Sequence, residues 1–162
     1  MTPVATGVAR VLVFGWGNLS RGDDALGPLC VAHLRDVLAG CAEVECLDDY
    51  QLQIEHALDL VGRERVLFID ASLTCQSPFE VTPLQAAQDA SFTTHAMSPQ
   101  AVMQVYCTMR DEAPPPCTLL AIRGERYELG ESPSAMALAN LSAALLWAQA
   151  WLKAPQAQLA HA

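Results

Sequence analysis

Acidic residues and a histidine follow the apolar segments of this sequence, at the points where buried strands would end. Asp23 and Asp24 close the stretch VFGWGNLSRGDD, Asp70 ends a later apolar run, and His95 lies in the loop before a long helical pattern. Two carboxylates and one imidazole suit a divalent first-row metal that keeps coordination positions open. The pattern therefore favours a divalent metal site at the strand ends, drawn from Asp23 or Asp24, Asp48-Asp49, Asp70 and His95.

Each of these residues also has an ordinary structural interpretation. Asp23 and Asp24 stand where acidic residues cap a helix and complement its dipole. Asp70 is in a position to cap the turn after a strand, and a single histidine in a loop is commonly exposed. Spacing by itself leaves these alternatives open.

The segment around residue 15 also resembles a dinucleotide-binding loop. Gly15 and Gly17 match the first two glycines of G-x-G-x-x-G, but Ser20 replaces the third, and Gly22 comes two residues late. Asp48 stands where an acidic residue would bind a ribose hydroxyl. A pyrophosphate binds at a helix N-terminus because that end attracts anions, and two adjacent carboxylates there would repel it. Dinucleotide binding is therefore the weaker hypothesis.

Apolar patterns of strand and helix type alternate along the chain. Continuous apolar runs are typical of strands buried in a parallel sheet, and spacings of three and four residues are typical of helices. We expect an α/β fold of three layers, α/β/α, with a twisted, mostly parallel sheet flanked by helices on both faces. The expected strands are 9–14, 42–47, 65–72, an edge strand 79–84 and 117–124; the expected helices are 25–39, 51–63, 99–110 and one opened by Ser132-Pro133 that runs to 153.

This fold would bring the candidate residues together. Ligands of open α/β sheets bind outside the carboxyl ends of the strands, which is where Asp24, Asp70 and the loop with His95 would meet. We expect residues 1–153 to form a single domain and residues 154–162 to form a flexible tail.

Composition narrows the class of protein. The chain has 162 residues, 52% of them hydrophobic, and a formal net charge of −9, which argues against a nucleic-acid partner. No apolar run approaches the roughly 20 residues of a membrane helix, and the start lacks the pattern of a signal peptide. We therefore expect a cytoplasmic protein with no membrane partner. Its six cysteines have no C-x-x-C spacing and are expected to be reduced and mostly buried.

Four segments together resemble the hydrogenase maturation endopeptidases, the processing proteases of nickel–iron hydrogenases. They are VLVFGWGNLSRGDDALGPLCVAHL, VLFIDAS, THAMSPQAVM and LLAIRGERYELGESPS, which occur in this order over roughly residues 9–150. YQLQIEHALDL and HAMSP resemble the subgroup that serves cytoplasmic, NAD-reducing hydrogenases. The most specific motif, G-x-G-N-x-x-x-G-D-[DE]-x-x-G, is present as Gly15, Gly17, Asn18, Gly22, Asp23, Asp24 and Gly27.

The resemblance implies an aspartyl-type endopeptidase with this fold. Its metal-contacting and catalytic positions fall on Asp24, Asp70 and His95. The implied reaction removes a C-terminal peptide from the precursor of a hydrogenase large subunit after nickel has been loaded. The nickel belongs to the precursor, so we expect no tightly bound cofactor in the protein itself, which we expect to be a monomer that docks transiently. A non-catalytic chaperone that checks the precursor for nickel is the alternative.

Two further features bear on this hypothesis. Many members carry a Gly-Gly-Thr-like turn where this chain has Asp49-Tyr50-Gln51, a change that concerns the choice of hydrogenase and not the reaction. No Ser-His-Asp order or nucleophile elbow occurs, and nothing near Cys75 in sequence would lower its thiol pKa. We therefore expect hydrolysis by water, with Asp24 or Asp70 as the general base.

Overall fold

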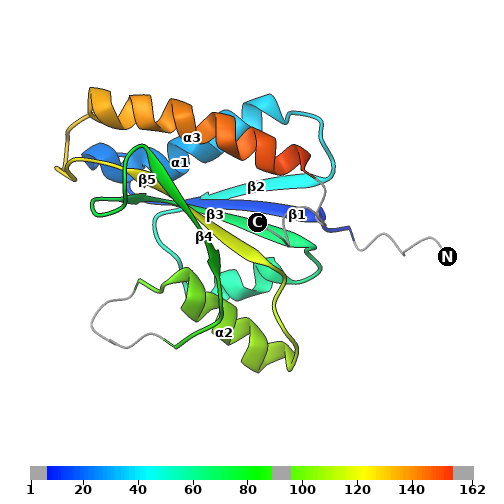
Figure 1. Cartoon of the computed structure of the whole chain (residues 1–162). Coiled ribbons are helices and arrows are strands. Elements are labelled where there is room, and N and C mark those ends of the chain that lie inside the picture. Colours follow the sequence, from blue (N-terminus) through cyan, green and yellow to red (C-terminus); the bar gives the residue numbers. More distant parts are fainter. Residues whose placement is uncertain (1–6, 89–95, 155–162) are drawn as a thin grey trace.

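A single five-stranded sheet forms the centre of the molecule, with the strand order β2-β1-β3-β5-β4 (Figure 1). The structure is a computed structural model and describes residues 7–88 and 96–154. The strands are β1 (Val11–Trp16), β2 (Val44–Asp49), β3 (Arg65–Ser72), β4 (Phe79–Leu84) and β5 (Cys117–Arg123). The helices are α1 (Leu26–Val37), α2 (Pro99–Arg110) and α3 (Ala135–Lys153), with two 3-10 helices, η1 (Gly22–Ala25) and η2 (Ile54–Leu60).

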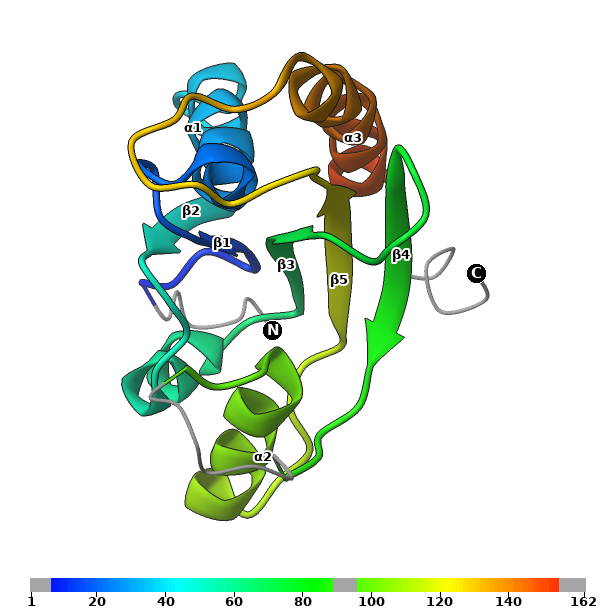
Figure 2. The same cartoon turned by 90° about the vertical axis from the view of Figure 1, so that its left-hand side faces the viewer.

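Helices cover both faces of this sheet, which confirms the expected three-layer α/β/α architecture. Strands β2, β1, β3 and β5 are parallel, and β4 pairs antiparallel with β5 at one edge. The helices α1 and α3 lie on one face, and α2 and η2 lie on the other (Figures 1 and 2). Pro83 lies in the edge strand β4, where a missing backbone donor is tolerated.

Alternating side chains of the central strands build a separate core on each face. Val13 of β1 and Ile69 of β3 join the cluster under α1 and α3, whereas Phe14 and Phe68 join the cluster under α2 and η2. These four side chains are no more than 2% exposed. Burial on both faces explains why these strands are continuously apolar in sequence.

The element boundaries match the sequence most closely where a cap or a long apolar run defines them. β3, β4 and α2 occupy the predicted residues, and the hydroxyl oxygen of Ser98 caps α2 by accepting a hydrogen bond from the Ala101 N–H (3.1 Å). β1 and β2 each begin two residues later than predicted. The expected helix at 51–63 is instead the seven-residue 3-10 helix η2, which ends where Val61 turns extended.

The last helix, α3, begins later than predicted and is unusually apolar. Its N-cap is Ser134, so the prediction that Ser132-Pro133 opens it is wrong. With 19 residues and a mean hydropathy of 1.3, α3 is long and apolar enough to cross a membrane. The sequence analysis did not expect an apolar segment of this length. One face of α3 packs into the core through Ala137, Leu141, Ala144, Ala148 and Trp151. We therefore interpret it as a partly buried core helix.

The cysteines are all free thiols, as expected. Only half of them are fully buried, so they are less buried than the sequence predicted. Cys30, Cys75 and Cys117 are buried, Cys46 and Cys107 are half-buried, and Cys41 is exposed.

Candidate functional site

The structure places Asp24 and Asp70 at the same carboxyl edge of the sheet. Asp24 lies in η1, which contacts β3, and Asp70 lies near the end of β3. The first turn of α1 fits tightly between the strand ends, because a Cβ atom at Gly27 would lie 2.4 Å from the Trp16 carbonyl oxygen and 2.9 Å from that of Ile69. Glycine at position 27 thus lets the acidic turn approach β3.

The loop after β1 fixes the orientation of Asp24. One carboxylate oxygen, Oδ2, accepts a hydrogen bond from the Asn18 N–H at 3.0 Å. Gly17 has a φ of +146°, and a Cβ atom there would lie 2.0 Å from the Asp24 carbonyl oxygen. The glycine is therefore required both for its backbone conformation and for the close approach. The half-buried Asp24 carboxylate is held by its own loop, and no basic side chain within residues 7–88 and 96–154 forms an ion pair with it.

Asp70 has an unusual electrostatic environment. Burial, followed by the negative charge of Asp24, raises the pKa of Asp70 to about 7, and the Ala71 N–H opposes this only in part. A cation beside the two carboxylates would offset the burial and the Asp24 charge that disfavour the ionised form of Asp70. The donor set of Asp24 and Asp70 therefore suits a divalent cation.

His95 lies outside the described residues, so its place at the site stays a prediction. Beyond this gap in the described residues, the Met97 N–H donates to the carbonyl oxygen of Leu52, in the loop after β2, at 3.2 Å. Asp70 has the same strand parity as Phe68 and so lies on the sheet face covered by α2, the helix that follows His95. Within residues 7–88 and 96–154, no group of three or more His, Cys, Asp or Glu side chains is placed to hold a metal ion.

Asp23 is a buried structural carboxylate, and the prediction that it caps its own helix is wrong. Neither η1 nor α1 receives a side-chain cap. Asp23 instead accepts hydrogen bonds from the N–H groups of Glu125 (2.7 Å), Arg126 (3.3 Å) and Ser134 (2.6 Å) and from the Ser134 hydroxyl (2.9 Å). Burial acts to raise the pKa of Asp23, but these hydrogen bonds outweigh it and lower the pKa below its usual value.

The β5–α3 loop, residues 124–134, packs against the turn that carries Asp23 and Asp24. It crosses the N-terminal end of α1 (Figure 2). Backbone hydrogen bonds join it to the loop after β1: Gly22 N–H to Glu131 O (3.0 Å), Asp23 N–H to Arg126 O (3.0 Å) and Gly130 N–H to Ser20 O (2.7 Å). Because these contacts link distant parts of the chain, sequence periodicity could not reveal them.

Tyr127 of the β5–α3 loop is a residue that the sequence analysis did not single out. It is half-buried in the β5–α3 loop, and its ring packs against the core cluster under α1 and α3. Burial, followed by the charges of Asp70 and Asp24, raises the pKa of Tyr127 well above its usual value. The only available signal was the resemblance of the segment GERYELGESPS, which did not single out the tyrosine.

The other acidic residues of this edge are engaged by neighbouring side chains. Asp48, the candidate ribose ligand of the dinucleotide hypothesis, accepts a hydrogen bond from the Arg35 guanidinium at 2.9 Å. The Asp49 carboxylate lies 3.1 Å from Nε2 of His56, and Nδ1 of His56 accepts the Gln53 N–H at 2.8 Å. With Nδ1 accepting, Nε2 carries the hydrogen that binds Asp49. This contact braces the loop after β2.

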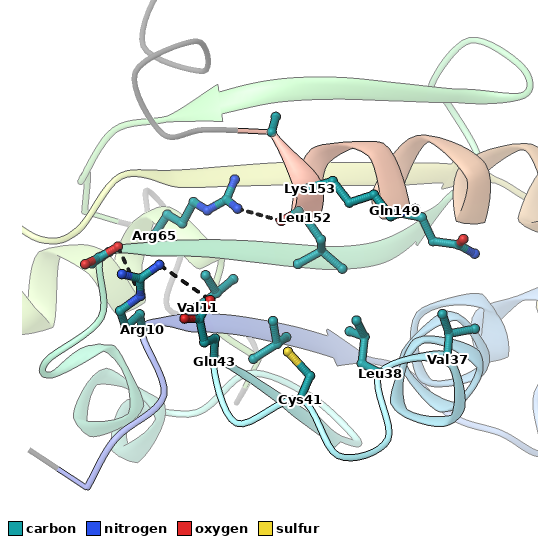
Figure 3. A pocket seen from close by; sticks show the side chains of 13 residues that line it. Arg10, Val11, Val37, Leu38, Cys41, Glu43, Arg65, Gln149, Leu152 and Lys153 are labelled. Atoms are coloured by element: carbon teal, nitrogen blue, oxygen red, sulfur yellow. Dashed lines mark hydrogen bonds and ion pairs between the residues drawn. The ribbon is translucent and has the colours of Figure 1, made fainter. Parts of the chain in front are cut away.

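A pocket of about 410 Å³ lies at the opposite, amino edge of the sheet (Figure 3). Its guanidinium groups already have partners. Arg65 donates to the carbonyl oxygens of Trp151 (2.8 Å) and Leu152 (3.0 Å), and Arg10 pairs with Glu43 and Glu64 at 3.6 Å each. We assign these arginines a structural role, since they hold the end of α3 and the chain entering the sheet.

Comparison with known proteins gives matches among solved structures. No protein-family model matches the chain, and no curated protein matches its sequence. It is similar to the hydrogenase maturating endopeptidase HybD from Escherichia coli, with 25% identity, a TM-score of 0.69, and 89% of this chain and 92% of that chain covered. The hydrogenase maturation protease HycI from Thermococcus kodakarensis is 24% identical, with a TM-score of 0.67 over 89% and 93% of the two chains.

A third similar structure is a hydrogenase 2 maturation peptidase from a Thaumarchaeota archaeon. It is 23% identical, with a TM-score of 0.62, and the match covers 89% of this chain and 98% of that one. A maturation protease for hydrogenase 3 also matches. The chain therefore shares the fold of the nickel–iron hydrogenase maturation endopeptidases. Because matching proteins serve different hydrogenases, the likeness concerns the fold and not the choice of substrate.

Proposed function

We propose that this protein is a processing endopeptidase that removes a C-terminal peptide from the nickel-loaded precursor of a nickel–iron hydrogenase large subunit. The observation that carries the proposal is the pair Asp24 and Asp70 at the carboxyl edge of a sheet with this fold. The pair lacks a basic partner among the described residues, and the charge of Asp24 helps to raise the pKa of Asp70, as expected of carboxylates that receive a cation. We further propose that the protein works in the cytoplasm as a monomer.

In this proposal, nickel arrives with the precursor and is part of the substrate. Asp24, Asp70 and His95 complete its coordination, which holds the scissile peptide at the edge of the sheet. Nickel polarises the peptide carbonyl or lowers the pKa of a bound water. Asp24 or Asp70 takes the proton of the attacking water, since a carboxylate near the reacting atoms can act as a general base.

The loop after β2 is suited to contact the body of the precursor. Tyr50 is 67% exposed and Ile54 is 62% exposed, next to the edge that carries the aspartates. The contact between Asp49 and His56 fixes the start of this loop. We assign to Asp49-Tyr50-Gln51 the selection of the hydrogenase, with a cytoplasmic, NAD-reducing enzyme as the expected substrate source.

The test is mass spectrometry of a large-subunit precursor, with and without nickel, after incubation with this protein. We expect loss of a C-terminal peptide only from the nickel-loaded precursor. Asp24→Asn, Asp70→Asn and His95→Ala should each abolish this loss. Asp36→Asn, which changes an exposed carboxyl of α1, is the matched control and should cleave normally.

Two outcomes would replace the proposal. A precursor that binds in a nickel-dependent way but keeps its mass would indicate the alternative, a non-catalytic chaperone that checks for nickel. Stabilisation of the protein by NAD or NADP, seen as a raised melting temperature, would favour dinucleotide binding. Cleavage that proceeds equally without nickel would contradict the proposed role of the metal.

A further inference from the structure

We infer that His56 is a positioning residue for precursor recognition: its hydrogen bond to Asp49 holds Tyr50 in the orientation that contacts the precursor. This inference rests on the proposed function and adds to it a buried side chain that does not itself touch the substrate. His56 acts through the loop after β2, and its effect is on the binding of the precursor and not on the cleavage step.

The imidazole of His56 is held on three sides. The residue is 8% exposed, and the centre of its ring lies 4.6 Å from the centre of the Phe14 ring in an edge-on contact. Nδ1 lies 2.8 Å from the backbone nitrogen of Gln53, and because a backbone N–H can only donate, Nδ1 accepts and carries no hydrogen. The ring hydrogen is therefore on Nε2, which donates it to the Asp49 carboxylate at 3.1 Å.

Asp49 connects this imidazole to two loops of the carboxyl edge. Its Oδ2 accepts the hydrogen bond from His56, and its Oδ1 accepts the Tyr50 N–H at 2.7 Å. Its carbonyl oxygen accepts the Gly17 N–H at 3.1 Å, in the loop that also holds the Asp24 carboxylate. The His56 contact therefore fixes the start of the loop after β2 next to the turn that carries the candidate metal ligand.

Only two residues of this loop lie between its fixed points. Leu52 is fully buried, and its carbonyl oxygen accepts the Met97 N–H at 3.2 Å. Asp49 fixes the other end, so Tyr50 and Gln51 span the segment between them. Tyr50 is highly exposed, so its side chain is available to a partner while its backbone is held. Without the His56 contact, this loop would have to be ordered when the precursor binds, and binding would be weaker.

A purely structural role of His56 would depend on its other ring nitrogen. The hydrogen bond from the Gln53 N–H to Nδ1 closes the first turn of η2, and it stabilises this helix whether or not a precursor binds. The hydrogen bond from Nε2 to Asp49 is the one that reaches the exposed loop. The two roles can be separated, because an asparagine side chain places a polar atom near the position of Nδ1 and a glutamine side chain places one near that of Nε2.

The test is single-turnover cleavage of the nickel-loaded precursor over a range of protein concentrations, with circular dichroism verifying that each variant is folded. The half-saturating concentration reports affinity, and the maximal rate reports the cleavage step. His56→Asn keeps an acceptor for Gln53 but loses the contact with Asp49, so its half-saturating concentration should rise about 10-fold at an unchanged maximal rate. His56→Gln keeps a donor for Asp49 and should stay within about twofold of the wild type. His33→Asn, at an exposed position of α1, is the matched control and should behave like the wild type.

Two further variants test the path from His56 to Tyr50. Asp49→Ala removes the same contact from an exposed position, without changing the buried ring, and should weaken binding as much as His56→Asn does. In a Tyr50→Ala background, His56→Asn should raise the half-saturating concentration by no more than about twofold, because the residue it positions is already gone. Tighter binding by His56→Asn than by His56→Gln, or a full effect of His56→Asn without Tyr50, would overturn this inference and leave the proposed function intact. A wild type that does not cleave would overturn the proposed function and this inference with it.

Discussion

Replacement of Asp70 by asparagine should stabilise the protein, and more so at pH 8 than at pH 5. The pKa of Asp70 is about 7 in the folded protein, against a usual 3.8 in an unfolded chain. The unfolded state therefore loses this proton at lower pH than the folded state does. As the pH rises from about 4 to 7, ionisation favours unfolding, and above the folded pKa of about 7 the whole cost is present.

The magnitude follows from the two pKa values. A pKa raised from 3.8 to about 7 corresponds to at most about 4 kcal/mol of unfolding free energy at pH 8 and to less than half of that at pH 5. Because Asp70 keeps some exposure to solvent, we expect roughly half of these amounts, or about 2 kcal/mol at pH 8. Asp70→Asn removes the ionisation and should recover this free energy.

Urea denaturation at both pH values measures the effect. Asp24→Asn removes one cause of the raised pKa and leaves the burial of Asp70, so it should stabilise by less. Asp36→Asn in α1 is the exposed control and should show little change between the two pH values. Equal effects of Asp70→Asn at pH 5 and pH 8, or a loss of stability at pH 8, would refute the electrostatic reasoning.

Three other substitutions test how the site is held. Asp23→Ala leaves the donors of the β5–α3 loop unpaired and should destabilise the protein by about 3 kcal/mol in urea denaturation; a loss under about 1 kcal/mol would contradict a buried anchor. Gly27→Ala forces a Cβ atom against the strand ends and should cost about 3 kcal/mol, lowering the melting temperature; an unchanged temperature would contradict the close approach. Arg65→Met removes two hydrogen bonds to the end of α3 and a guanidinium 4.2 Å from the centre of the Trp151 ring. It should cost about 2 kcal/mol while precursor cleavage stays normal, and slower cleavage would contradict a purely structural role.

The sequence predicted those parts of the fold that local chemistry determines. β3 is apolar along nearly its whole length because both faces are buried, and α2 begins where Ser98 offers a cap and Pro99 a first helical residue. The meeting of Asp24 and Asp70 at one edge was also predictable, since parallel strands place their carboxyl ends together. The place of His95 at this edge stays a prediction from the sequence, because His95 lies outside the described residues.

Tertiary contacts explain what the sequence did not predict. Ser132 and Ser134 are both suitable helix caps. The helix α3 begins at Ser134, whose N–H and hydroxyl also donate hydrogen bonds to Asp23. The segment after β2 is a 3-10 helix that begins at the contact of the Gln53 N–H with Nδ1 of His56 and ends where Val61 turns extended, and neither feature could be recognised from apolar spacing. Tyr127 belongs to a loop without periodicity, so the sequence pattern did not single it out.

The hydrogen bonds that Asp23 accepts from Glu125, Arg126 and Ser134 of the β5–α3 loop span 102, 103 and 111 positions of the sequence. Contacts of such long sequence separation form late, because loop-closure entropy opposes them until the chain between them has folded. A nascent chain that has completed β1 and β3 thus contains Asp24 and Asp70 but not yet the β5–α3 loop. We expect the backbone amides of the β5–α3 loop to show weaker hydrogen-exchange protection than those of the sheet.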